Sequence, residues 1–285
     1  ITGTVEAIIR YNGVLFAGTQ SGIYYLPTNT SPDKNENNKR AQFVSIPGIS
    51  MECWDMVSFK KGSYSMLLAG LNDGIYEVKP DKSVSIIMKG APWTLFQSKT
   101  DSSRVYVGLD DGIASIYFDK GRWIEEGKIK GIEEPVFKIT EDENGNLWLG
   151  TFKQGVIKLN FYMSNEMSAL VAKKGLHRDV KIFRYTTKHG LPEGDFIIIK
   201  EKNIPPLFGT DKGIYRFDEK EERFFQDTVI MKKINRDGRS IHRFNKDNKG
   251  NLWMVNYVGS EFEVGFAKFL SDTDIIWNST PFVEI

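Results

Sequence analysis

Catalysis and metal binding need histidine, cysteine or carboxylate side chains that converge, and the spacing of these residues predicts no such convergence. The three histidines show none of the short His-x-His or His-x-x-x-His spacings of metal sites. They are His177, His189 and His242. We interpret His189, which begins a His-Gly-Leu-Pro segment, as a turn residue. The sequence therefore predicts no catalytic residue, no metal site and no cofactor.

Carboxylate side chains give no acid–base pair either. Adjacent residues of a strand point to opposite faces of the sheet, which separates the two members of each acidic pair. The pairs are Asp110-Asp111, Glu125-Glu126 and Glu133-Glu134. Two acidic turns, at residues 142–146 and 247–251, are similar to calcium loops but lack the later bidentate glutamate. We interpret both as hairpin turns that need no metal.

The single cysteine, Cys53, excludes an internal disulfide framework and a multi-cysteine metal site. It stands in an apolar run beside Trp54, and we predict that it is buried in the core.

Composition narrows the class of protein. Of the 285 residues, 40% are hydrophobic and 13% aromatic, which is ample for a core. The net charge of +1 offers no electrostatic case for direct nucleic-acid binding. No run of 18 apolar residues exists, so we expect membrane contact only through segments outside this chain. The sequence begins at Ile1 without a Met or an apolar leader, and we expect it to be a piece of a longer protein.

One hairpin recurs along the chain and organises it. At residues 141–160 it reads as an acidic turn, a short apolar strand that ends at Gly150, a turn closed by Gly155 and an alternating strand. The other copies stand at residues 14–26, 66–78, 105–118, 207–217 and 251–269. A second glycine closes the turn in five copies, and we predict a positive φ there because no β-branched residue tolerates one cheaply. These glycines are Gly22, Gly74, Gly112, Gly155 and Gly213.

The first glycine of each hairpin gives the period. Gly18, Gly70, Gly108, Gly150 and Gly209 are separated by 52, 38, 42 and 59 residues. Periods of about 40 to 50 residues with several strands each are typical of propeller blades. We therefore predict an all-β propeller of four-stranded blades, with six blades in this chain. Whether the intact ring has six or seven blades stays open.

The repeats define one propeller domain or propeller fragment over residues 1–285. We place them at about residues 4–46, 51–88, 92–129, 135–186, 195–226 and 240–277, with 281–285 as the start of a following strand. An insertion at 161–179 has the apolar spacing of a short amphipathic helix. Pro205 and Pro206 predict a brief second strand in the fifth repeat. We expect Trp148 and Trp253 to be buried between neighbouring blades.

Three segments carry a family resemblance. Asp-Glu-Asn-Gly-Asn-Leu-Trp-Leu-Gly-Thr at 142–151, its echo at 247–253 and Tyr-Thr-Thr-Lys-His-Gly-Leu-Pro at 185–192 resemble the two-component regulator propeller repeat. Such repeats occur in the extracytoplasmic sensor regions of bacterial hybrid two-component systems and in regulators that end in a triple-tyrosine module. The resemblance implies a periplasmic, membrane-anchored sensor that does not itself catalyse, with an output module outside this chain.

Propeller topology says where a ligand site belongs. Loops between the second and third strands share one face with the loops that enter each innermost strand. The first set presents Asn72, Asp110, Lys153 and Asp211, and the second presents Glu52, Trp54, Trp93 and Asp195. Trp54 and Trp93 could stack on a sugar ring whose hydroxyls the polar residues bind. The alternative is that both tryptophans close the interface between blades.

Three functions stay open. The first, which we favour, is a sensor that binds a carbohydrate, another small ligand or a partner and shifts an equilibrium in the output module. The second is a propeller enzyme, such as a lyase or a glycoside-active protein, which converging carboxylates or a histidine–metal cluster would indicate. The third is a structural platform for protein interaction, including a homodimer formed through neighbouring modules.

Overall fold

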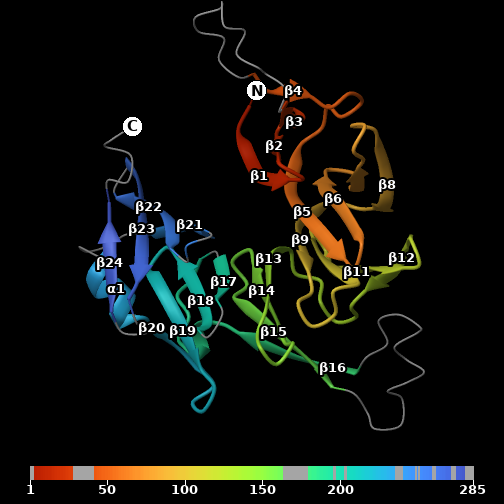
Figure 1. The fold of residues 1–285 in the computed structure, drawn as a ribbon. Helices are drawn as coiled ribbons and strands as arrows, with labels where there is room; N and C mark the ends of the chain where they lie inside the picture. The colour runs from red at the N-terminus through yellow and green to blue at the C-terminus, as the bar shows by residue number, and fades with distance from the viewer. Residues whose placement is uncertain are drawn as a thin grey trace, which may run out of the picture. The chain divides into compact units, whose positions relative to one another are not determined.

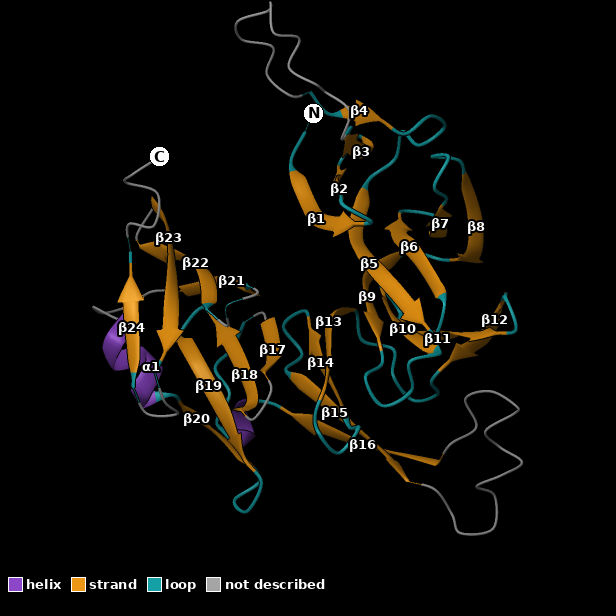
Figure 2. Ribbon diagram, in the orientation of Figure 1, coloured by secondary structure: helices purple, strands orange, loops and turns teal. Residues whose placement is uncertain are grey.

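Antiparallel sheet accounts for most of the computed structural model (Figure 2). The structure describes residues 3–27, 42–162, 179–194, 197–201, 204–234, 240–247, 249, 251–258, 261–270 and 274–279. Within these ranges the strands β1 to β24 form six four-stranded sheets. Each sheet is a meander in which neighbours in sequence are neighbours in space (Figure 1). The predicted all-β propeller class with six four-stranded blades is confirmed.

The strands of the first three blades have the following bounds. Blade one contains β1 (Val5–Tyr11), β2 (Val14–Thr19), β3 (Gly22–Leu26) and β4 (Val44–Ser45). Blade two contains β5 (Cys53–Lys61), β6 (Tyr64–Leu71), β7 (Gly74–Val78) and β8 (Val84–Lys89). Blade three contains β9 (Pro92–Gln97), β10 (Arg104–Leu109), β11 (Gly112–Asp119) and β12 (Arg122–Lys128).

The other three blades follow in the same way. Blade four contains β13 (Val136–Glu141), β14 (Leu147–Thr151), β15 (Val156–Tyr162) and β16 (Asp179–Tyr185). Blade five contains β17 (Ile197–Glu201), β18 (Ile204–Thr210), β19 (Gly213–Asp218) and β20 (Arg223–Gln226). Blade six contains β21 (Ser240–Lys246), β22 (Leu252–Val258), β23 (Glu261–Phe269) and β24 (Ile275–Asn278).

The described residues divide into two compact units, one up to Val136 and one from Phe137 onward. Each unit has its own apolar cores, and each core fills the space between adjacent blades. In the first unit Phe16 and Ile23 of blade one meet Leu67 and Ala69 of blade two. The second strands are covered on both faces, which explains why they read as continuous apolar runs.

The first glycine of the hairpin lies where the next blade packs against the strand, so that a side chain would not fit. A Cβ at Gly18 would lie 2.6 Å from Sγ of Cys53, the first residue of β5. A Cβ at Gly108 would lie 2.3 Å from the carbonyl oxygen of Val136, the first residue of β13. Cys53 is itself fully buried, as predicted. In blades one to three the repeat period therefore records the close approach of the second strand to the residue that begins the next blade.

The second glycine has the predicted positive φ in four of its five copies. The values are +130° at Gly22, +123° at Gly112, +88° at Gly155 and +110° at Gly213. The prediction is wrong at Gly74, whose φ lies outside the left-handed region. A Cβ there would lie 2.4 Å from the carbonyl oxygen of Met88 in β8, so close approach of the outer strand requires the glycine instead.

Blade five corrects one expectation about strand length. β18 runs over seven residues, Ile204–Thr210, and contains both Pro205 and Pro206, although these were expected to keep it brief. The pairing of β17 with β18 shifts register between Ile199 and Glu201, and the pairing of β18 with β19 begins only at Leu207. The prolines thus stand at an irregularity of the ladder, where no regular N–H donor is needed.

Helical structure differs from the prediction. The α-helix α1 (Thr228–Ile234) follows blade five and was not predicted, because seven residues are too few to show a periodic pattern. Asp227 caps it by accepting a hydrogen bond from the Ile230 N–H at 2.7 Å. In the predicted insertion at 161–179, the first two residues continue β15 and Asp179 begins β16. The helix expected between them, and the strand expected at 281–285, lie outside the described residues.

Trp148 is buried as predicted, and it lies between blades four and five. Its ring is 1% exposed and packs edge-on against Phe208 and Phe217 of blade five, at centroid distances of 5.3 and 5.1 Å. Trp253 is only half-buried and packs against Phe266 of its own blade, with centroids 4.9 Å apart.

Candidate functional site

In the first unit, four of the predicted site residues meet where blade two joins blade three. The rings of Trp54 and Trp93 contact each other with centroids 4.3 Å apart and planes 56° apart. The indole N–H of Trp54 donates to Oδ1 of Asn72 at 2.6 Å, and the Asn72 N–H donates to the carbonyl oxygen of Glu52 at 3.2 Å. Asp110, also predicted, is exposed in the turn between β10 and β11.

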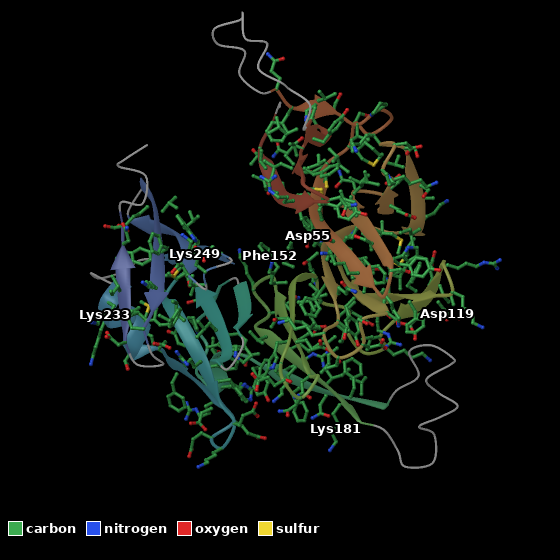
Figure 3. All side chains as sticks on the ribbon, viewed as in Figure 1. Asp55, Asp119, Phe152, Lys181, Lys233 and Lys249 are labelled. Atoms are coloured by element: carbon green, nitrogen blue, oxygen red, sulfur yellow. The ribbon has the colours of Figure 1, made fainter. Side chains whose placement is uncertain are left out.

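The tilt of the two indoles favours the structural alternative for this pair. Because the two rings contact each other, each covers part of the surface that a sugar would need. Next to them Asp55 of β5, labelled in Figure 3, accepts hydrogen bonds from Oγ1 of Thr94 and from the Leu95 N–H, both at 2.9 Å. These contacts join the innermost strands of blades two and three. Sugar stacking by Trp54 and Trp93 stays a prediction.

In the second unit, two predicted residues line a cavity of about 560 Å³. They are Lys153, from the loop between β14 and β15, and Asp211, from the loop between β18 and β19. The volume falls within the range of about 300–1,000 Å³ that is typical of small-molecule sites. The other lining residues are Gln154, Gly155, Thr186, Thr187, Pro192, Glu193 and Gly194. The eighth predicted residue, Asp195, lies outside the described residues.

The loop that carries Lys153 has a constrained backbone. Lys153 has φ +61°, a conformation that residues other than glycine seldom adopt. Two residues on, a Cβ at Gly155 would lie 2.0 Å from the carbonyl oxygen of Tyr185. Oγ1 of Thr151 donates to the carbonyl oxygen of Gly155 at 2.7 Å and closes the turn. The position of Lys153 is therefore set by backbone geometry.

A short 3₁₀ turn, η2 (Thr187–His189), shapes the second wall of the cavity. Nδ1 of His189 accepts a hydrogen bond from the Thr186 N–H at 3.1 Å, and its ring packs edge-on against Tyr185 at 5.4 Å. Gly190 ends the turn with φ +87°. This confirms the interpretation of His189 as a turn residue, and it leaves the side chains of Thr186 and Thr187 exposed.

The third wall brings a carboxylate against a glycine. A Cβ at Gly194 would lie 3.0 Å from Oδ1 and 3.3 Å from Cγ of Asp211, and Gly194 has φ +132°. A side chain at this position would therefore be tight against Asp211 and would also be strained by the positive φ. Burial and then the nearby charge of Asp211 raise the pKa of Tyr215 above its usual value, which places that carboxylate close to the phenol.

An exposed aromatic residue directly precedes Lys153 in the chain and was not predicted. Phe152, labelled in Figure 3, is 46% exposed and directly precedes Lys153. Its ring centroid lies 5.7 Å from that of Phe137, and Nζ of Lys153 lies 5.0 Å from its centre. Nothing in the sequence indicates this exposure, because Phe152 follows an apolar strand and resembles one more core residue.

Metal binding finds no support in the described ranges, where no three His, Cys, Asp or Glu side chains are grouped as a metal site requires. The turn of residues 142–146, which is similar to a calcium loop, uses its carboxylate internally. Oδ1 of Asp142 accepts the backbone N–H groups of Asn144 and Asn146, and Oδ2 accepts Nδ2 of Asn146 and the indole N–H of Trp148, all within 3.0 Å. Among the same residues no helix is long and apolar enough to cross a membrane.

Part of the chain matches the model of a known protein family. Residues 130–153 match the family model described as "Two component regulator propeller". This segment is similar to a two-component regulator propeller repeat. The match confirms the resemblance predicted from the sequence, and the matched repeat ends at Lys153, which lines the cavity. No curated protein is significantly similar to the chain in sequence.

Solved structures share the fold at low sequence identity. The extracellular domain of BT4673 from B. thetaiotaomicron, described as a hybrid two component system, is 14% identical, with a TM-score of 0.40 over 92% of this chain and 40% of that one. This chain therefore spans less than half the length of that structure. Streptogramin B lyase is 11% identical, with a TM-score of 0.58 over 96% of this chain and 82% of that one. The β-propeller domain of Cps50 (Swd1) from Myceliophteria thermophila is 10% identical, with a TM-score of 0.58 over 99% and 88%.

Proposed function

We propose that this chain is a non-catalytic, ligand-binding sensor propeller of a bacterial signal-transduction regulator, and that the cavity of blades four and five is its binding site. The proposal rests on two findings that meet at Lys153, the match to the family model and the cavity. The matched segment, residues 130–153, supplies Lys153 to a cavity of about 560 Å³. In this proposal the chain works outside the cytoplasm, in the periplasm, as part of a membrane-anchored protein.

The lining suits a polyhydroxylated ligand such as a carbohydrate. The hydroxyl groups of Thr186 and Thr187 and the amide of Gln154 offer both donors and acceptors. Phe152, the residue before Lys153, is 46% exposed, and an aromatic ring of this kind can pack against a sugar ring. A few convergent polar groups beside an aromatic surface are typical of small-molecule sites.

The cavity also has the construction that a sensor needs. Its walls come from a loop of blade four, from the segment between the blades and from a loop of blade five. A ligand that contacts all three walls stabilises one arrangement of them over others. It can shift an equilibrium in an output module only through such differential affinity.

A thermal-shift screen of the chain against mono- and oligosaccharides tests the proposal. A ligand should raise the melting temperature by mass action, and Lys153→Gln and Asp211→Asn should abolish the shift. Lys220→Gln and Glu221→Gln, in the exposed turn between β19 and β20, are matched controls that should retain it. The proposal is wrong if no carbohydrate shifts the melting temperature of the folded chain.

Two further readouts separate the alternatives. If Trp54→Ala or Trp93→Ala abolishes binding while the cavity variants retain it, the ligand site is the tryptophan pair of the first unit. Mass spectrometry of the ligand after incubation should recover it unchanged, and conversion to a product would instead establish a propeller enzyme.

For the intact protein in cells, labelling of an introduced surface cysteine by a membrane-impermeant maleimide should place the propeller outside the cytoplasm.

A further inference from the structure

The charges that line the cavity are unequal in sign. Its three ionisable side chains are Lys153, Glu193 and Asp211, so two carboxylates stand against one ammonium group. The ammonium group of Lys153 lies 5.0 Å from the centre of the Phe152 ring. The electrons of the ring attract the ammonium group, which makes it a weaker partner for an anion. The cavity is thus a better site for a cation than for an anion.

Both carboxylates stay available to a ligand. The nearest cation to Asp211 is Nζ of its neighbour Lys212 at 3.9 Å, and both side chains are at least half exposed, so water screens this pair. Glu193 forms no ion pair with any other residue that the structure describes. A ligand that brings a positive charge gains interactions here without having to displace a strong one.

One of these carboxylates lies close to the backbone of the segment that connects the blades. Asp211 lies so close to Gly194 that a Cβ there would be 3.0 Å from Oδ1. Gly194 also has φ +132°, a conformation that favours glycine. The lack of a side chain at Gly194 therefore leaves room for the carboxylate of Asp211 beside the connecting segment.

We propose that the ligand of this cavity carries a primary ammonium group, as a sugar with a free amine does. This inference rests on the proposed function and names the chemical class of its ligand. The ammonium group donates charge-assisted hydrogen bonds to Asp211 and Glu193, which are roughly twice as strong as neutral ones. The sugar hydroxyls meet Thr186, Thr187 and Gln154. Acetylation of the amine removes the charge, and a uronic acid brings a charge of the wrong sign.

Isothermal titration calorimetry with three oligosaccharides of equal length tests this class. Oligomers of β-1,4-linked glucosamine, N-acetylglucosamine and glucose differ only in the group at carbon 2: ammonium, acetamide or hydroxyl. At pH 6 and low salt the glucosamine oligomer should bind about tenfold more tightly than the other two. The preference should weaken as salt is added, because the carboxylates are exposed to screening.

Variants assign the preference to the carboxylates. Asp211→Asn and Glu193→Gln should each reduce the affinity for the glucosamine oligomer several-fold more than that for the glucose oligomer, while Glu221→Gln should change neither. Equal or tighter binding of the neutral oligomers overturns the inference and leaves the proposed function standing. Failure of all three, and of every other carbohydrate in the thermal-shift screen, overturns both.

Discussion

The ammonium group of Lys158 lies 4.7 Å from the centre of the Trp148 ring, inside the core between blades four and five. Lys158 is 7% exposed, and its Nζ also lies 5.4 Å from the centre of the Phe217 ring. Both carboxylate oxygens of Glu219 accept hydrogen bonds from it, at 2.8 and 3.0 Å. A lysine of blade four is thereby held between aromatic rings and a carboxylate of blade five.

This arrangement predicts an ordering of two substitutions. Lys158→Ala should lower the free energy of unfolding by about 2 kcal/mol, because it removes a desolvated cation–π contact and the aliphatic stem that packs on Trp148. Glu219→Gln should lower it by about 1 kcal/mol or less, since that carboxylate is 67% exposed. Urea unfolding measures both, with Lys220→Ala as the exposed control. A larger loss for Glu219→Gln than for Lys158→Ala would contradict the conclusion that the contact of Lys158 with Trp148 stabilises the core more than the ion pair does.

Blade three contains a buried ion pair between Arg104 and Glu126, and the residue next to Glu126 is an exposed glutamate. Nε and Nη2 of Arg104 donate to the two carboxylate oxygens of Glu126 at 2.7 and 2.9 Å, and Oγ of Ser115 donates to the same carboxylate. Burial by itself lowers the pKa of Arg104, but the hydrogen bonds and charge of Glu126 outweigh it and raise that pKa. The neighbouring Glu125 is exposed.

Glu126→Gln should therefore lower the free energy of unfolding by about 2 to 3 kcal/mol, because it removes the bidentate partner of the buried guanidinium group of Arg104 and leaves Asp101, at 2.6 Å from Nη1, as its only carboxylate partner among the described residues. Glu125→Gln removes the same charge from the adjacent residue and should change stability by less than about 0.5 kcal/mol. Chemical denaturation of the two variants gives the comparison. Similar values for both would show that the ion pair does not stabilise blade three.

Two glycines of blade three separate backbone strain from close approach. Gly112 and Gly127 both have positive φ, +123° and +86°, but a Cβ at Gly112 would lie 2.4 Å from the carbonyl oxygen of Ile132, and one at Gly127 would meet nothing within 4 Å. Gly127→Ala should lower stability by about 1 kcal/mol through strain alone. Gly112→Ala should lower it by at least about 3 kcal/mol, because backbone must move as well. Thermal denaturation of the two variants distinguishes these effects, and equal losses would contradict the structure.

The turn that begins at Asp247 predicts a dependence of stability on pH. Its carboxylate accepts hydrogen bonds from the indole N–H of Trp253, from Nδ2 and N–H of Asn251 and from the Lys249 N–H. These bonds, that of Trp253 first, hold the pKa of Asp247 well below its usual value. Since the folded pKa is lower than the unfolded value of about 3.9, the stabilisation is complete above that pH and is lost as the pH falls through the folded pKa.

Asp247→Asn should accordingly be less stable than the unaltered chain at pH 7 and at pH 5, and the difference should shrink in acid. Urea unfolding at a series of pH values down to about 2 measures it. Glu221→Gln, which removes an exposed carboxylate, should show no such convergence. A stability difference for Asp247→Asn that is constant over the whole range would exclude the carboxylate hydrogen bonds as its cause.

Local signals in the sequence predicted the blades well. The glycine that ends each second strand, the alternation of the third strand and the acidic turn are all features of one hairpin, and they act within about 20 residues of each other. Where the pairing of a neighbouring strand decided the geometry, prediction failed. Gly74 faces the carbonyl oxygen of Met88, and the prolines of β18 fit an irregularity that depends on how β17 pairs.

The residues of the candidate site were also predicted only in part. Lys153 and Asp211 were predicted because each stands in the loop between the second and third strands of its blade, a position that the repeat alone fixes. The sequence could not show that Thr186, Glu193 and Gly194 lie beside them, because a cavity is the space left over when side chains of several segments have packed. It could not show the exposure of Phe152 for the same reason. Sequence thus determined the class of fold and the loops that bear polar residues, whereas tertiary packing alone decided which of these residues share a cavity and what charge that cavity has.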